Sequence, residues 1–130
     1  MGSLEGKVAL VTGASRGLGK DIAVSLAMAG ASVMVTARTE RDSDSHIPGS
    51  LATTVADIET QGGTASSMRC DVTSEVDIRN TIDGTIEKFG RLDIVVNNAG
   101  ILIPGGITDL QVKHWDLIFR VNVLGPFLMA

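Results

Sequence analysis

A cluster of glycine and hydroxyl residues near the N-terminus has the composition of a phosphate-binding turn. Gly13, Gly17 and Gly19 follow the apolar stretch 8–11, and an apolar stripe at helical spacing then runs to Gly30. A strand, a glycine turn and a helix N-terminus together offer unpaired backbone N–H groups and a partial positive charge to a pyrophosphate. The spacing G-x-x-x-G-x-G differs from the general dinucleotide pattern, so a tight turn without a ligand is the alternative.

Polar side chains also follow each later strand-like stretch of the chain. They are Arg38 after residues 31–36, Asp71 at the end of 64–71, and Asn97 and Asn98 after 92–96. Ligands of parallel sheets bind beyond the carboxyl ends of the strands. We therefore expect these side chains and the glycine turn to lie at one site.

Helical patterns separate the strand-like stretches. Apolar residues recur every three or four positions over 51–58, 78–89 and 112–119, and Ser74 and Thr108 each begin a capping-box sequence. Trp115 and Phe119 are expected in the core. The alternation of strands and helices predicts an α/β fold, a doubly wound parallel sheet of Rossmann type. The polar segment 38–50 is expected to be a surface loop, and a flap on the cofactor side is the alternative for its part 40–50.

Composition narrows the class of protein. The chain has 130 residues, 44% of them hydrophobic and 20% charged, which is typical of one globular domain. Its net charge of −4 and lack of a basic cluster argue against a nucleic-acid partner. Cys70 is the single cysteine, so no internal disulfide forms, and no apolar run is long enough to cross a membrane. A cytoplasmic location is the resulting expectation. Neither histidine has neighbours at metal-ligand spacing, so no metal site is expected.

The C-terminal residues are apolar and carry no helix stop signal. Residues 1–130 would also leave one edge of a four-stranded sheet open. We therefore expect one Rossmann-type domain over residues 1–130, truncated within the helix that contains Asn122, as the N-terminal half of a longer protein.

Several of these motifs together resemble the short-chain dehydrogenase/reductase family. The resemblance covers residues 4–130 and is carried by the runs 12–19, 70–72, 97–100 and 121–123. It implies a single doubly wound domain that binds a nicotinamide cofactor. The backbone of 13–19 would hold the pyrophosphate, Asp71 and Val72 would contact the adenine, and residues 98–100 would line the path to the nicotinamide. An aspartate that only caps the following helix is the alternative for Asp71.

The residue after the second strand indicates which nicotinamide cofactor is preferred. NAD-preferring sites usually have an acid there, whereas this chain has Arg38. A guanidinium pairs with a 2′-phosphate, and Arg16 supplies a second cation, so we expect NADP rather than NAD; two solvated arginines are the alternative. The expected cofactor-binding residues are Gly13, Ser15, Arg16, Gly17, Leu18, Gly19, Arg38, Asp71, Val72, Asn98, Ala99 and Gly100.

The resemblance implies hydride transfer between the cofactor and a carbonyl or alcohol substrate. The family uses a tyrosine, a lysine, a serine and an asparagine, of which only the asparagine is matched here, by Asn122. Its side chain is expected on the inner helix face, where a relay water would satisfy it; an asparagine that only bonds nearby backbone is the alternative. The chain contains no tyrosine, so the serine and the Tyr-x-x-x-Lys motif are expected beyond Ala130, and the 130 residues alone are expected to be inactive.

Two other functions are compatible with parts of the pattern. A nucleotide-binding or regulatory protein could keep the fold without catalysis. A methyltransferase that binds S-adenosylmethionine also uses a glycine turn, but that ligand has no phosphate for Arg38 to meet. The resemblance further implies a homodimer or homotetramer that uses the helix containing Asn122.

Overall fold

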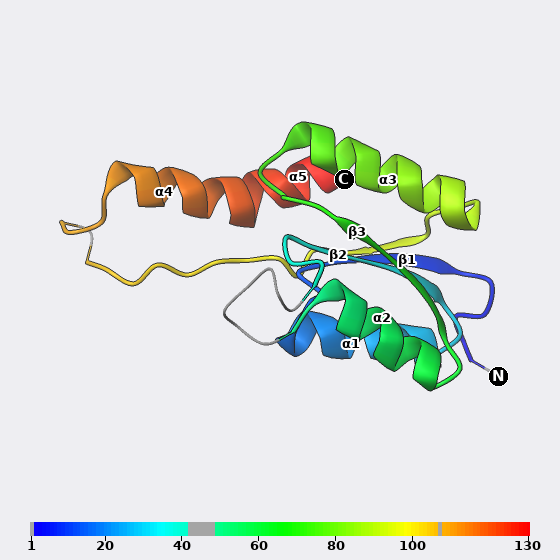
Figure 1. Cartoon of the computed structure of the whole chain (residues 1–130). Helices are drawn as coiled ribbons and strands as arrows, with labels where there is room; N and C mark the ends of the chain where they lie inside the picture. The colour runs from blue at the N-terminus through cyan, green and yellow to red at the C-terminus, as the bar shows by residue number, and fades with distance from the viewer. Residues whose placement is uncertain (1, 42–48, 107) are drawn as a thin grey trace.

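The computed structural model describes residues 2–41, 49–106 and 108–130 and forms three layers (Figure 1). The elements in chain order are β1 (Val8–Thr12), α1 (Gly17–Met28), β2 (Ser32–Ala37), α2 (Leu51–Thr60), β3 (Thr64–Arg69), α3 (Glu75–Phe89), β4 (Ile94–Val96), α4 (Val112–Phe119), the π-helical turn η2 (Arg120–Leu124) and α5 (Gly125–Met129). All strand pairs are parallel, and the sheet order is β3-β2-β1-β4. The predicted doubly wound parallel sheet is confirmed.

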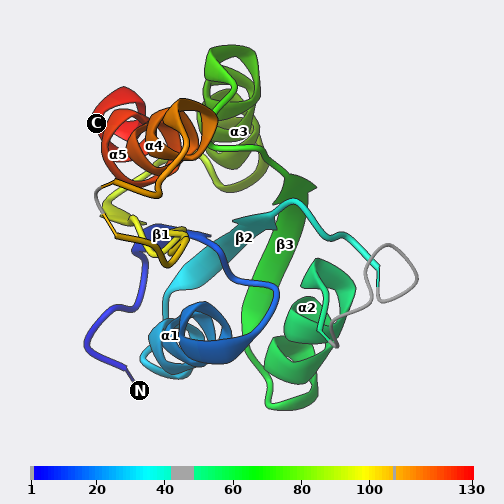
Figure 2. The ribbon, with the colours of Figure 1, turned by 90° about the vertical axis from the view of Figure 1, so that its left-hand side faces the viewer.

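The helices cover the two faces of the sheet (Figures 1 and 2). Helices α1 and α2 lie on one face, and α3 and α5 lie on the other. Alternate residues of the central strands supply the two cores: Val11, Val33 and Val35 face α1 and α2, whereas Leu10 and Met34 belong to the α3 and α5 side. Because both faces are covered, β1 is buried along its whole length and β2 is buried except at its two end residues.

The helix starts were predicted correctly in one case and wrongly in another. Ser74 is the N-cap of α3, and its hydroxyl accepts from the Asp77 N–H at 3.2 Å. The Asp77 side chain does not return to Ser74, however; it accepts from the Asp71 N–H instead. Thr108 begins no helix, because the chain makes a turn there and α4 starts after Gln111.

Helix α4 lies outside the packed layers. None of its residues is buried, and Figure 1 shows it extending beyond the end of the sheet. The expectation that Trp115 and Phe119 are core residues is therefore wrong for this chain: their exposed fractions are 51% and 46%, and the rings contact each other with centroids 4.9 Å apart. Strand β4 is only half-buried because it lies at the sheet edge. In the described residues, none of the helices has the length and apolar character needed to span a bilayer.

Candidate cofactor site

The glycine turn connects the centre of the sheet to the first helix. The Ala14 N–H donates to the Thr36 carbonyl of β2 at 3.0 Å, which holds the turn beside the neighbouring strand. A Cβ added to Gly19 would overlap the carbonyl of Gly13, so only glycine lets α1 approach the turn this closely. Helix α1 has no side-chain cap, and its first-turn N–H groups have no intrahelical acceptors. The turn therefore presents free donors at a narrow backbone cradle.

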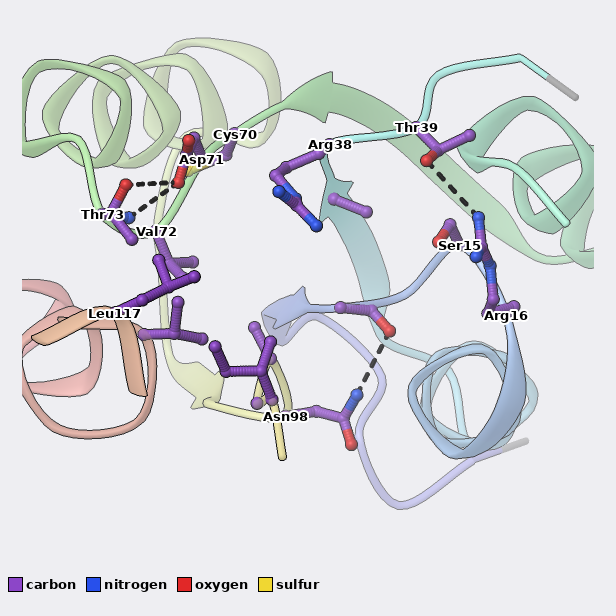
Figure 3. Close-up of a pocket in the computed structure, with 16 residues that line it drawn as sticks. Ser15, Arg16, Arg38, Thr39, Cys70, Asp71, Val72, Thr73, Asn98 and Leu117 are labelled. Carbon is purple, nitrogen blue, oxygen red and sulfur yellow. Dashed lines mark hydrogen bonds between the residues drawn. The ribbon is translucent and has the colours of Figure 1, made fainter. Parts of the chain in front are cut away.

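A cleft of about 290 Å³ opens beside this turn, at the carboxyl ends of the strands (Figure 3). Segments from all four strand ends contribute to it, together with α4 and η2. The lining residues are Gly13, Ser15, Arg16, Ala37, Arg38, Thr39, Cys70, Asp71, Val72, Thr73, Asn98, Ala99, Gly100, Ile101, Leu117 and Val121. The structure thus brings together all the predicted site residues except Gly17, Leu18, Gly19, Asn97 and Asn122. The three residues at 17–19 form the first turn of α1 at the edge of the cleft.

Asp71 lies on one wall of the cleft and is held by its own loop (Figure 3). Its Oδ1 accepts from the Thr73 N–H at 2.9 Å and from the Thr73 hydroxyl at 2.7 Å. Partial burial raises the pKa of Asp71, but these two hydrogen bonds and the nearby charges of Arg38 and Arg69 outweigh it and leave the pKa below its ordinary value. Asp71 is therefore a fixed, ionised acceptor. It does not cap α3, because Ser74 has that role.

Two arginines lie on the opposite wall, in different surroundings. Arg38 follows β2, is exposed, and forms no hydrogen bond or ion pair with any residue that the structure describes. Arg16 is half-buried and donates from Nη2 to the Thr39 hydroxyl and to the Gly49 carbonyl. Among the described residues, the wall therefore carries one cation without a hydrogen-bond or ion-pair partner and one that has two hydrogen-bond acceptors.

The end of β4 is fastened to the glycine turn. Asn98 Nδ2 donates to the Gly13 carbonyl at 3.1 Å, as Figure 3 shows, and the Ala99 N–H donates to the Thr12 hydroxyl at 2.9 Å. Thr12 is fully buried, so its side chain joins β1 to the loop after β4 inside the protein. These bonds set the width of the cleft between the turn and residues 98–100.

Asn122 holds the backbone of Ile101, in the loop that follows β4. Its Oδ1 accepts from the Ile101 N–H and its Nδ2 donates to the Ile101 carbonyl, both at 2.9 Å. Asn122 lies in the π-helical turn η2, a local irregularity of a kind often found at functional sites. The side chain is exposed in this chain rather than buried on an inner helix face, and backbone groups occupy both ends of its amide.

Sequence reasoning missed several residues of the cleft. Thr39 and Thr73 are polar residues within two positions of predicted site residues, and their nearness to Arg38 and Asp71 was an available signal. Leu117 and Val121 reach the cleft from α4 and η2, and nothing in their helical spacing distinguished them from core residues. Across the described ranges 2–41, 49–106 and 108–130 there is no group of carboxylate, histidine or cysteine side chains arranged for a metal.

Comparison with known proteins identifies the family. The model for short chain dehydrogenases matches residues 7–130. The chain belongs to the short-chain dehydrogenase family. It is 39% identical over 129 residues to hydroxysteroid dehydrogenase-like protein 2 of Danio rerio, and 40% identical over 127 residues to versicolorin reductase of Emericella nidulans. These alignments cover 99% and 98% of this chain, but 31% and 46% of the relatives.

Solved short-chain dehydrogenases have the same fold. A short chain dehydrogenase from Mycobacterium smegmatis superposes with a TM-score of 0.89 at 33% identity, covering 99% of this chain and 51% of that one. A metagenomic short-chain oxidoreductase in complex with NADP superposes with a TM-score of 0.85 at 37% identity, covering 98% of this chain and 54% of that one. The chain therefore spans about half the length of these short-chain dehydrogenases, and its fold matches theirs over that half.

Proposed function

We propose that this chain is the cofactor-binding part of an NADP-dependent reductase or dehydrogenase that acts on a small carbonyl or alcohol substrate. The observation that carries the proposal is the convergence of three features on one cleft. These are the glycine turn beside α1, the fixed carboxylate of Asp71, and Arg38, which no described residue pairs. Pyrophosphate, 2′-phosphate and adenine need complementary groups of these three kinds.

The residues present fit such a cofactor. A side chain at Gly19 would overlap the Gly13 carbonyl, so glycine there lets the N-terminus of α1 lie against the turn that would hold a phosphate. Oδ1 of Asp71 already accepts two hydrogen bonds, whereas no described group bonds its Oδ2, which is left to accept from an adenine amino group. Arg38 would pair with the 2′-phosphate. Residues 98–100 and Ile101 would line the nicotinamide end of the cleft.

Bound nicotinamide would supply the hydride chemistry, and this chain would position it. Asn122 would hold the Ile101 backbone, and with it the wall of the nicotinamide pocket, through its two hydrogen bonds. The proton donor must come from elsewhere, because the 130 residues include no tyrosine. We propose that the catalytic serine and the Tyr-x-x-x-Lys pair lie beyond residue 130 of the natural protein, which would make residues 1–130 the N-terminal half of its domain.

Titration of the full-length protein tests this function. We expect NADPH to bind at least about tenfold more tightly than NADH, since a guanidinium–phosphate bond contributes about 1.5–3 kcal/mol. We also expect consumption of NADPH with a carbonyl substrate, followed through the absorbance of the reduced nicotinamide. Failure to bind either nucleotide would refute the proposal. Binding without turnover of any carbonyl or alcohol in a broad panel would favour a non-catalytic nucleotide-binding protein instead.

We also propose a cytoplasmic protein that assembles as a homodimer or homotetramer. The exposed apolar side chains of α4 and η2, among them Trp115, Phe119 and Val123, support a buried contact along this helix in the whole protein. Light scattering of the full-length protein measures the assembly, and a monomeric mass would contradict it.

A further inference from the structure

One arginine fastens both described ends of the segment between β2 and α2 to the glycine turn. Arg16 Nη2 donates to the Thr39 hydroxyl at 3.4 Å and to the Gly49 carbonyl at 3.2 Å. Figure 3 shows the Arg16 side chain directed toward Thr39, while Arg38 is directed into the cleft. A single guanidinium nitrogen therefore joins residues 39 and 49, which lie ten positions apart in the chain.

The backbone at Gly49 packs directly on the glycine turn. A Cβ added to Gly49 would lie 2.8 Å from the Cβ of Arg16 and 2.8 Å from the Ser15 carbonyl, and its φ of +108° is in the left-handed region. Glycine is required there for both reasons. Five residues later, the hydroxyl of the fully buried Thr54 donates to the Ala14 carbonyl at 2.8 Å. The start of α2 is thus built onto the same turn that would hold the pyrophosphate.

Backbone hydrogen bonds close the base of the segment. The Leu51 N–H donates to the Thr39 carbonyl and the Ala52 N–H donates to the Glu40 carbonyl, both at 3.0 Å. Arg16 lies against this base, and its Nε is buried without a hydrogen-bond partner among the described residues. Leaving a buried donor unpaired is unfavourable, so the pose must be held by the two bonds that Nη2 makes and by the packing around the side chain.

These contacts indicate different roles for Arg16 and Arg38. We propose that Arg16 is a positioning residue, which ties Thr39 and Gly49 to the glycine turn, and that discrimination in favour of a 2′-phosphate rests on Arg38. This inference rests on the proposed function and revises the expectation that both cations meet the phosphate. Arg38 follows directly from β2 and precedes Thr39, so the tether also holds the backbone that carries Arg38.

A matched pair of variants of the full-length protein, Arg16→Met and Arg38→Met, tests the division. The first measurement is hydrogen exchange of the Leu51 and Ala52 amides without nucleotide. The second is the ratio of the dissociation constants for NADH and NADPH. For Arg16→Met we expect exchange about tenfold faster and a ratio changed less than about threefold, because the lost bonds hold the segment. For Arg38→Met we expect unchanged exchange and a ratio lowered about tenfold or more.

The opposite pattern would overturn the inference. If Arg16→Met lowers the ratio as far as Arg38→Met does, or leaves the exchange of both amides unchanged, Arg16 is not the tether. Thr39→Val, which removes one acceptor, is the second test should Arg16→Met fold poorly. Thr39→Val should speed hydrogen exchange of the Leu51 and Ala52 amides. In the double variant, it should cause no further increase over Arg16→Met, because Arg16→Met has already removed the hydrogen bond to Thr39. If the wild-type protein binds neither nucleotide, the proposed function fails, while the exchange data still decide the tether.

Discussion

Gly19→Ala should damage cofactor binding more than it damages the fold. The added Cβ would overlap the Gly13 carbonyl and approach Asn98 Nδ2, whereas ordinary contacts begin near 3.4 Å. Helix α1 must therefore withdraw by about 1 Å. Overpacking of this kind costs about 1–3 kcal/mol. The better helix propensity of alanine offsets up to about 1 kcal/mol of this loss of stability. The net loss in free energy of unfolding should therefore lie between about 0 and 3 kcal/mol.

The effect on the nucleotide follows from hydrogen-bond length. A donor that moves back by about 1 Å no longer reaches a phosphate oxygen, and each lost bond to a charged acceptor costs about 1.5–3 kcal/mol. We therefore expect the dissociation constant for NADPH to rise at least about tenfold in the full-length protein. Calorimetric titration and urea unfolding of the same preparation measure the two effects.

Gly17→Ala is the matched control. A Cβ at Gly17 meets nothing within 4 Å, but φ there is +58°. This variant should lose about 1–2 kcal/mol of stability from backbone strain alone, with a smaller rise in the dissociation constant than Gly19→Ala. The reasoning would be refuted if Gly19→Ala bound NADPH within about threefold of wild type, or if the two variants weakened binding equally.

Three further predictions concern single side chains. Asp71→Asn should weaken NADPH and NADH binding by a similar factor. The folded-state pKa of Asp71 is lowered, so its contribution to stability is present above the unfolded pKa near 4 and is lost as pH falls through the lower folded pKa. In an acid titration, the variant should therefore lose stability less steeply than wild type below about pH 4. Thr54→Val should lower the free energy of unfolding by about 1–3 kcal/mol, because the Ala14 carbonyl loses a buried hydrogen-bond donor. The control Thr60→Val, on the exposed side of the same helix, should change the free energy of unfolding little. Equal losses for the two variants in urea unfolding would contradict this. Asn122→Ala should speed hydrogen exchange in the loop after β4 and reduce kcat more than it weakens NADPH binding, and an unchanged exchange rate would show that its amide does not hold that loop.

The parts of the site that the sequence predicted are those with a local signature. Gly13 stands between an apolar strand and a helix, Gly19 lies in the first turn of that helix, and Asp71 lies three residues before the N-cap of the next helix. In these cases the neighbouring residues determine the local backbone, and the parallel topology then brings the strand ends together. The cleft contains Asp71 and the glycine turn because both follow strands of one sheet.

The parts that were missed depend on contacts between distant residues. Arg16 donates to Thr39 and to the backbone of Gly49, which are 23 and 33 positions away in the chain, so these partners could be found only from the folded structure. Trp115 and Phe119 show the converse case. Their helical spacing predicts an amphipathic helix, but the spacing does not show which surface packs against the apolar side. In the described residues of this chain, no surface buries these two side chains.

The position of β1 in the sheet has a consequence for how the chain is made. β1 is the first strand synthesised, yet it pairs with β2 on one side and with β4 on the other. The ribosome must add roughly sixty residues after β2 before β4 emerges, which takes on the order of 3–12 s at about 5–20 residues per second. During that interval one edge of an apolar, β-branched strand lacks its partner and is open to pairing with other chains. Aggregation during synthesis should therefore depend on the rate at which residues 38–94 are translated, even in variants whose finished fold is equally stable.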